Sequence, residues 1–233
     1  MIDPTEALEH ARSSPDREIC GLILRVGDEE VYMPCRNVAE GKMEFKIHPE
    51  DWAEAEDRGT ILEIIHSHPH GAPRPSEADL VECERWGLPW TIIALPSEKM
   101  YSFAPSGYRA PLIGRTYAFG VLDCWTLIRD WYAEEWGITL PDFEYSESEW
   151  KNGPSLHLKY AKTCGFTEIS GRELRRGDVI LFNLQSREPN HSGVYLGDML
   201  FLHHLTKQPS GTDIFGGYWK LKATHYFRRE ELS

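Results

Sequence analysis

The first residues that could do chemistry are two histidines and an aspartate, His66, His68 and Asp79. Side chains two positions apart on a β-strand point to the same face, so both imidazoles leave the end of a predicted strand on one side. A helix is predicted to begin near Ser76, because Ser-x-x-Asp before an apolar-periodic segment is a helix-entry signal. Asp79 then lies in the first helical turn and can reach back toward the histidines. Two neutral imidazoles and one carboxylate, with a fourth position left to water, are the ligand set of a catalytic zinc site.

The second group is a cysteine and a set of histidines in the other half of the chain. Cys124 follows Asp123 at the start of a predicted helix, where the helix N-terminus favours negative charge, so we expect a lowered thiol pKa. His191 opens a predicted strand, and His203 lies on the next one. Adjacent antiparallel strands can bring these histidines together, which gives the nucleophile, base and orienting residue of a cysteine peptidase. Alternation along the strand leaves either His203 or its neighbour His204 as the orienting residue.

Each of these residues also has a purely structural interpretation. His-x-His pairs are common on surfaces and in cores, and Asp79 can serve only as a helix cap. A lone cysteine in an apolar neighbourhood is usually an inert core residue. The complete patterns, rather than the single residues, therefore carry the chemical hypothesis.

The elements that must position the first group alternate between strands and helices. The predicted helices and strands of this half cover residues 3–12, 18–26, 31–35, 45–48, 49–58, 60–66, 76–86, 90–95 and 100–104. Such alternation indicates an α/β domain, with a mixed sheet and flanking helices, over residues 1–105.

A linker is predicted over residues 106–111, because this stretch holds proline and glycine and has no apolar period. The second domain then covers residues 112–233. Its predicted helices are followed by short strands, over residues 124–136, 155–164, 179–182, 193–196, 200–203 and 218–227. Helices first and then a run of strands indicate an α+β domain.

Composition excludes several classes of protein. The chain has 233 residues, with 25 basic and 37 acidic side chains and a net charge of -12, so it is a poor candidate for binding nucleic acid. Its five cysteines are scattered without a C-x-x-C pair, which argues against a disulfide scaffold. No apolar run is long enough to span a membrane. The acidic N-terminus lacks the features of a signal peptide, so we expect synthesis in a cytoplasm.

The first group resembles the signature of the JAMM (MPN) metalloprotease family, His-x-His-Pro-x6-Ser-x2-Asp. The resemblance implies one zinc ion on His66, His68 and Asp79. It further implies that Glu18, on an earlier strand, takes the proton of the zinc-bound water, and that Ser76 stabilises the oxyanion. The substrate of such a centre is a peptide or isopeptide bond.

The second group resembles the NlpC/P60 family of papain-like cell-wall peptidases, through residues 114–124, 174–182 and 191–198. The resemblance implies a papain-like fold and a peptidoglycan stem peptide as the substrate, cleaved at the γ-D-glutamyl to diamino-acid bond. One departure is Trp125, where many members of the family have serine.

The NlpC/P60 resemblance also implies a role for each site residue. Cys124 is the nucleophile, His191 the base and His203 the third polar residue. Tyr117 matches the family tyrosine whose hydroxyl lies near the oxyanion. Asp123 matches the residue that helps to hold the free amine of the substrate.

A JAMM unit followed by an NlpC/P60 unit resembles a family of tail assembly proteins of lambda-like bacteriophages. This resemblance implies other tail-tip proteins as partners, a place in the host cytoplasm during assembly, and the virion tail tip or the periplasm on delivery. Two alternatives stay open: an assembly factor in which one or both centres are inactive, and a bacterial cell-wall hydrolase.

Overall fold

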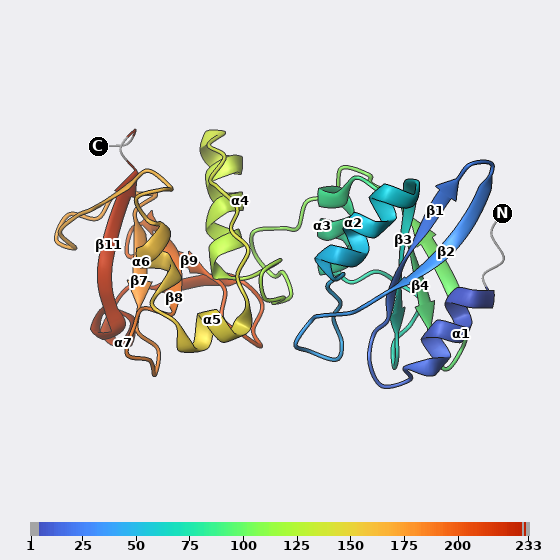
Figure 1. Ribbon diagram of the computed structural model, residues 1–233. Coiled ribbons are helices and arrows are strands. Elements are labelled where there is room, and N and C mark those ends of the chain that lie inside the picture. The colour runs from blue at the N-terminus through green and yellow to red at the C-terminus, as the bar shows by residue number, and fades with distance from the viewer. Residues whose placement is uncertain (1–4, 230, 232–233) are drawn as a thin grey trace. The chain divides into compact units, whose positions relative to one another are not determined.

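The chain forms two compact units in the computed structural model, which describes residues 5–229 and 231 (Figure 1). The division lies between Arg109 and Ala110, inside the stretch predicted as a linker. Each unit has its own sheet and helices, so the prediction of two domains that mix α and β structure is confirmed. The limits at residues 105 and 112 stay a prediction. The predicted start of the first helix at Asp3 lies outside the described residues.

The N-terminal unit is built on a five-stranded sheet with strand order β2-β1-β3-β4-β5. Its elements are α1 (Thr5–Ser13), β1 (Cys20–Val26), β2 (Glu29–Cys35), α2 (Pro49–Arg58), β3 (Thr60–His68), α3 (Glu77–Trp86), β4 (Trp90–Ala94) and β5 (Lys99–Phe103). β3 pairs antiparallel with β1 and parallel with β4, which makes the sheet mixed, as predicted.

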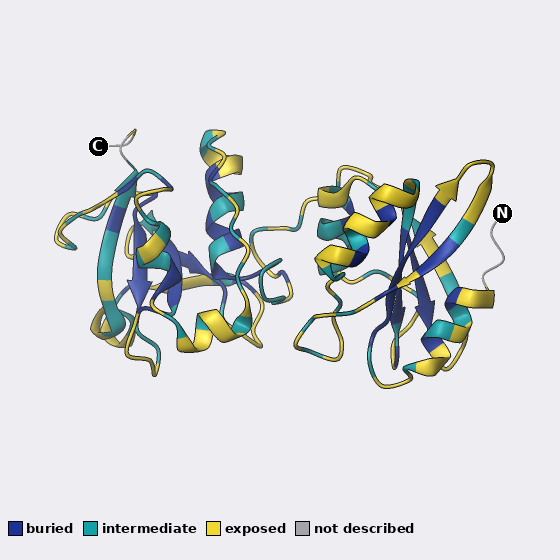
Figure 2. Cartoon of the chain, viewed as in Figure 1, coloured by how far each residue is buried: buried dark blue, intermediate teal, exposed yellow. Residues whose placement is uncertain are grey.

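Helices cover both faces of this sheet. α1 packs Ala11 against the face that carries Ile65, whereas α2 and α3 pack Ala55 and Cys83 against the face that carries Ile64. Successive residues of β3 thus pack into opposite cores, and the strand is buried from Ile64 to Ser67. Figure 2 shows the central strands of this sheet as buried.

The predicted strand over residues 45–48 is wrong. Only one isolated bridge, between Asn37 and Ile47, forms in this part of the chain. The side-chain amide of Asn37 donates to the carbonyl of Glu44 over 2.9 Å and accepts from the backbone N–H of Lys46 over 3.0 Å. A side chain therefore makes hydrogen bonds that a partner strand would otherwise supply.

The C-terminal unit has a six-stranded sheet with strand order β10-β9-β8-β7-β11-β6, and neighbouring strands in this order pair antiparallel. Its elements are α4 (Cys124–Trp136), α5 (Glu147–Asn152), α6 (Leu156–Tyr160), β6 (Phe166–Glu168), β7 (Val179–Phe182), β8 (His191–Gly197), β9 (Leu200–His203), β10 (Gly211–Ile214), α7 (Gly217–Lys222) and β11 (Ala223–Arg229).

α4 packs its apolar face on this sheet. Leu127, Ile128 and Trp131 lie in one buried cluster with Val194 of β8 and Leu202 of β9. The helix begins and ends where the sequence predicts, because Asp123 caps its first turn and Gly137 adopts a left-handed conformation at its end (φ 65°). Among the described residues, no helix is both long and apolar enough to cross a membrane.

The predicted strand over residues 218–227 is only partly correct. Its first part is the short helix α7, and β11 begins at Ala223. Aromatic residues in this stretch suggest a strand, yet Tyr218 and Leu221 are exposed on the helix. The predicted helix over residues 155–164 is also shorter in the structure, where α6 ends at Tyr160.

Candidate active sites

β3 and α3 position the first centre. His66 and His68 stand at the end of β3, on the face that α3 covers, and His66 pairs with Cys20 of β1 and Ile92 of β4. Ser76 and Asp79 form a capping box, in which the Ser76 hydroxyl accepts from the backbone N–H of Asp79 over 3.1 Å. The cap therefore fixes Asp79 in the first turn of α3, opposite the end of β3.

The three predicted ligands converge. The Nε2 atoms of His66 and His68 are 3.2 Å apart. Asp79 places Oδ1 at 3.5 Å from Nε2 of His66 and Oδ2 at 3.5 Å from Nε2 of His68. One ligand atom from each residue lies within 4.8 Å of the other two. Two ring nitrogens and a carboxylate in this arrangement fit a single zinc ion.

The protonation states of His66 and His68 also suit metal ligation. Nδ1 of His68 donates to the carbonyl of Ala72 over 3.0 Å, and a carbonyl only accepts, so the lone pair of this ring lies on Nε2. Burial lowers the pKa of His66 to about 4, which keeps the ring neutral. Phe45 stacks on His66 at 4.7 Å between ring centroids and holds its orientation.

Glu18 lies just before β1 and is 6% exposed. Its backbone N–H donates to the carbonyl of Lys42, and its carbonyl accepts from the Asn37 amide. Burial raises the pKa of Glu18 to about 8; His68 opposes the rise and the charge of Asp79 adds to it. The carboxyl group therefore interacts with two of the three candidate ligands, and without a bound cation burial favours its protonated form. A metal ion on these ligands would stabilise the carboxylate that a general base requires.

Cys124 is the first residue of α4, directly after the N-cap Asp123. One oxygen of Asp123 accepts from two backbone N–H groups of the first helical turn, and the other accepts from Gly120 N–H and the Tyr145 hydroxyl. The carboxylate is 3% exposed and has four donors. Its role toward a substrate amine stays a prediction, and in the structure the group serves as a helix cap.

The neighbouring strands β8 and β9 bring His191 and His203 together. Nε2 of His191 lies 3.0 Å from Nδ1 of His203. His204 points elsewhere, packing edge-on against Tyr117 at 5.1 Å between ring centroids. Of the two histidines that the sequence leaves as alternatives, His203 is therefore the one that contacts His191.

The expectation of a lowered Cys124 pKa is wrong. Burial raises the pKa of the thiol to about 12 and the charge of Asp123 raises it further, whereas the hydroxyl and backbone N–H of Ser192 oppose the rise. Burial, followed by the charges of His203, His157 and His204, lowers the pKa of His191. The pair therefore rests as a neutral thiol and a neutral imidazole.

Tyr117 lies near the nucleophile. Burial, followed by the charges of Cys124 and Asp123, raises the pKa of its phenol. A protonated hydroxyl at this place is a hydrogen-bond donor, as an oxyanion requires.

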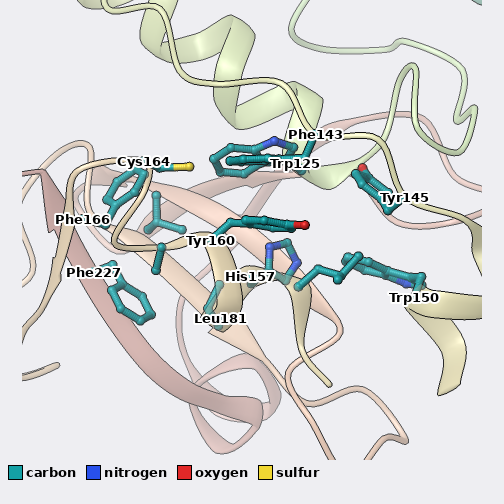
Figure 3. Close-up of a pocket in the computed structure, with 13 residues that line it drawn as sticks. Trp125, Phe143, Tyr145, Trp150, His157, Tyr160, Cys164, Phe166, Leu181 and Phe227 are labelled. Atoms are coloured by element: carbon teal, nitrogen blue, oxygen red, sulfur yellow. The ribbon is translucent and has the colours of Figure 1, made fainter. Parts of the chain in front are cut away.

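An aromatic pocket adjoins the start of α4 (Figure 3). Its cavity measures about 40 Å³ and is lined by Trp125, Phe143, Tyr145, Trp150, Leu156, His157, Tyr160, Ala161, Cys164, Phe166, Val179, Leu181 and Phe227. Nε2 of His157 is buried and has no hydrogen-bond partner among the described residues. Sequence reasoning missed His157, because no neighbouring pattern distinguishes it from an ordinary helical residue.

Asp213 of β10 was also missed by sequence reasoning. Its Oδ2 lies 3.3 Å from Nε2 of His203 and accepts from Nε1 of Trp219 over 2.9 Å. No local spacing links these residues to His191, so only the folded chain reveals the connection.

Comparison with known proteins assigns both halves. Residues 4–104 match the family described as prokaryotic homologs of the JAB domain, and residues 114–228 match the NlpC/P60 family. The tail tip assembly protein K of Escherichia phage N15 is 34% identical over 97% of this chain and 93% of its own length. The chain belongs to the tail tip assembly protein K family. The protein K of Escherichia phage lambda is 36% identical over 77% of this chain and 86% of its own.

A solved NLP/P60-family structure from Staphylococcus aureus is 25% identical and covers 50% of this chain and 37% of its own, with a TM-score of 0.34. The matches to the two families confirm the predicted combination of a JAB/MPN-like unit with an NlpC/P60 unit. The second unit therefore has a peptidase-type hydrolase fold, and the first contains a His-His-Asp group that could hold a metal ion.

Proposed function

We propose that the C-terminal unit is a cysteine endopeptidase that cleaves the stem peptides of peptidoglycan. The observation that carries the proposal is the hydrogen bond between His191 and His203, together with the hydrogen bond that links Cys124, at the start of α4, to Ser192, the residue after His191. The match of residues 114–228 to the NlpC/P60 family supports the class of substrate.

Catalysis begins from the neutral pair. The Cys124 sulfur attacks the scissile carbonyl carbon while its proton passes to His191, and Tyr117 with backbone N–H groups donates to the oxyanion. The C–N bond then breaks as His191 protonates the leaving amine, which leaves a thioester on Cys124. Water attacks the thioester, His191 takes the proton of that water, and the free carboxylate and thiol are released.

The proposed bond joins a γ-D-glutamyl residue to the diamino acid. Asp123 is the candidate group for the free amine of the stem peptide. Because its carboxylate already accepts from four donors, the Tyr145 hydroxyl must leave Oδ2 before an amine binds there. Binding of the correct substrate would thus be coupled to a movement of Tyr145.

For the N-terminal unit we propose a zinc-dependent peptidase or isopeptidase centre. His66, His68 and Asp79 would hold the metal, which supplies Lewis acidity and lowers the pKa of a bound water. Glu18 accepts a proton from water and returns it to the leaving amine. The Ser76 hydroxyl donates to the substrate oxygen while it continues to cap α3.

Family membership supports a proposal for the cellular setting. We propose that the chain acts at the tip of a phage tail, with other tail-tip proteins as partners. It would lie in the host cytoplasm during assembly and reach the tail tip or the periplasm on delivery. The relatives are named as assembly proteins, which supports a second candidate function, an assembly factor that docks partners while one or both centres are inactive.

Digestion of purified sacculi separates the two candidates. Wild type, Cys124→Ala and His68→Ala are incubated with sacculi, and the released fragments are identified by mass. The peptidase proposal requires fragments cut at the glutamyl to diamino-acid bond from wild type and His68→Ala, and a loss of at least about 10³-fold for Cys124→Ala. Wild-type protein that assembles tails but leaves sacculi intact would contradict the proposal and support the assembly factor.

Elemental analysis tests the metal centre. Wild type purified without chelator should hold about one zinc ion per chain, and Asp79→Asn should hold much less, because the site loses an anionic ligand. Glu82→Gln, a change on the same helix α3, is the matched control and should keep the metal. Equal zinc in the two variants would contradict the assignment of Asp79 as a ligand.

A further inference from the structure

Four side chains from separate elements form a line of hydrogen bonds in the C-terminal unit. His191 of β8 and His203 of β9 are joined through Nε2 and Nδ1 over 3.0 Å. Nε2 of His203 and Oδ2 of Asp213, on β10, are joined over 3.3 Å. Nε1 of Trp219, on α7, donates to the same oxygen over 2.9 Å.

The carboxylate gives this line a direction. An ionised carboxylate only accepts, so the proton in the bond to Asp213 belongs to Nε2 of His203. A neutral His203 then has its lone pair on Nδ1 and accepts from Nε2 of His191. Nδ1 of His191 is therefore left without a proton and can accept one from the Cys124 thiol.

Without the carboxylate, the direction is open. Two neutral imidazoles share one proton across their hydrogen bond, and either ring can donate it. If His203 donates through Nδ1, the proton of His191 must lie on Nδ1. His191 would then have no lone pair on that nitrogen to act as a base.

Trp219 holds the acceptor in place. Its indole N–H binds Oδ2 of Asp213, and its ring packs edge-on against His203 at 4.7 Å between centroids. The Asp213 side chain itself is 51% exposed, so replacing it leaves no cavity in the core. A change at this position therefore tests proton placement with little effect on packing.

We propose that Asp213, held by Trp219, is a positioning residue that fixes the tautomer of His203 and thereby leaves Nδ1 of His191 unprotonated. Its catalytic meaning rests on the proposed peptidase function. The residue touches no reacting atom and acts through two imidazoles. When His191 takes up a proton, the carboxylate also stabilises the positive charge through His203.

Nitrogen NMR of the full chain labelled with ¹⁵N-histidine tests the proton positions directly. In wild type near pH 7.5, His203 should carry its proton on Nε2, and His191 should carry its proton on Nε2 as well. In Asp213→Leu, which removes the acceptor, the preference should be lost and the His203 proton should lie on Nδ1 in a substantial share of the molecules. Unchanged tautomers in Asp213→Leu would overturn the proposal.

Kinetics on sacculi supply the second measurement. Asp213→Asn should lose on the order of 10- to 100-fold in kcat/KM, as removal of an indirect orienting partner does, and Asp213→Glu should recover part of the loss. Trp219→Phe, which keeps a ring but removes the N–H donor, should lose less. The matched control is Asp198→Asn in the exposed turn after β8, where φ is 48°, a conformation that asparagine adopts readily.

The pH profile distinguishes a positioning role from a structural one. The titratable groups that bear on the two histidines are Asp213, His157 of α6 and His204 after β9. Loss of Asp213 should shift the acidic limb of the pH profile of kcat/KM to lower pH, because the negative charge that favours protonated His203 is removed. A uniform loss at every pH, with no shift of that limb, would overturn the proposal. Wild type with the expected tautomers but no hydrolysis would overturn the proposed function and support the proton assignment.

Discussion

His157 should make the C-terminal unit sensitive to acid. Burial lowers the pKa of this histidine to about 4, and the charge of Asp123 only partly opposes the effect. Its Nε2 has no partner among the described residues, and its ring packs edge-on against Trp150 at 5.0 Å between centroids (Figure 3). A proton on this ring would therefore be buried in an aromatic environment.

The sign and size of the effect follow from linkage. Well above pH 6.5, both the folded and the unfolded chain hold His157 almost entirely neutral, so the group contributes almost no pH dependence. As the pH falls from 6.5 toward 4, the unfolded chain binds the proton and the folded chain does not, and the free energy of unfolding decreases. With values of about 6.5 and about 4 in the two states, the loss at pH 5 is ~2 kcal/mol.

The perturbation is His157→Phe, which keeps an aromatic ring and removes the titration. Free energies of unfolding are measured at pH 7 and pH 5 by urea titration, with hydrogen exchange of α4 peptides reporting the C-terminal unit alone. Wild type should lose ~2 kcal/mol more than the variant between the two pH values. His225→Phe, on the partly exposed strand β11, is the control. An equal loss in wild type and His157→Phe would refute the reasoning, whatever their absolute stabilities.

Three further predictions concern the same unit. Arg228 donates over 2.7 Å to each oxygen of Asp178, which is 1% exposed, so Arg228→Met should cost about 3–5 kcal/mol of unfolding free energy in urea titration; a cost under about 1 kcal/mol would contradict this. Alkylation of Cys124 by iodoacetamide, followed by peptide mass, should accelerate about tenfold per pH unit from pH 6 to 8, because the raised thiol pKa leaves little thiolate; a rate independent of pH would indicate a preformed ion pair instead. Tyr145→Phe removes a 2.7 Å bond to the Asp123 carboxylate and should destabilise the unit by about 1.5–3 kcal/mol in the same titration, while no change would mean that water replaces the hydroxyl.

Local patterns predicted the parts of the sites that local sequence controls. Ser76 and Asp79 form the expected capping box, and α4 begins at Cys124 because Asp123 caps it. His66 and His68 share a face because strand alternation requires it.

The remaining features depend on the tertiary fold. The hydrogen bond from His203 to Asp213 forms because β10 pairs with β9, and no spacing in the sequence specifies that pairing. The thiol of Cys124 has a raised pKa because the folded chain buries it. This effect of burial on the pKa outweighs the lowering that the sequence predicts from the position of Cys124 at a helix N-terminus. His157 was missed for the same reason, since its environment comes from segments far apart in the chain.

The central claim is that Cys124 and His191 act as one catalytic unit. The direct measurement is the rate of release of free amino groups from sacculi by Cys124→Ala, His191→Ala and the double variant. Because each residue needs the other, the three variants should lose a similar amount of activity, and the double variant should be no slower than Cys124→Ala. Losses that multiply in the double variant, or a single variant that retains the wild-type rate, would contradict the claim.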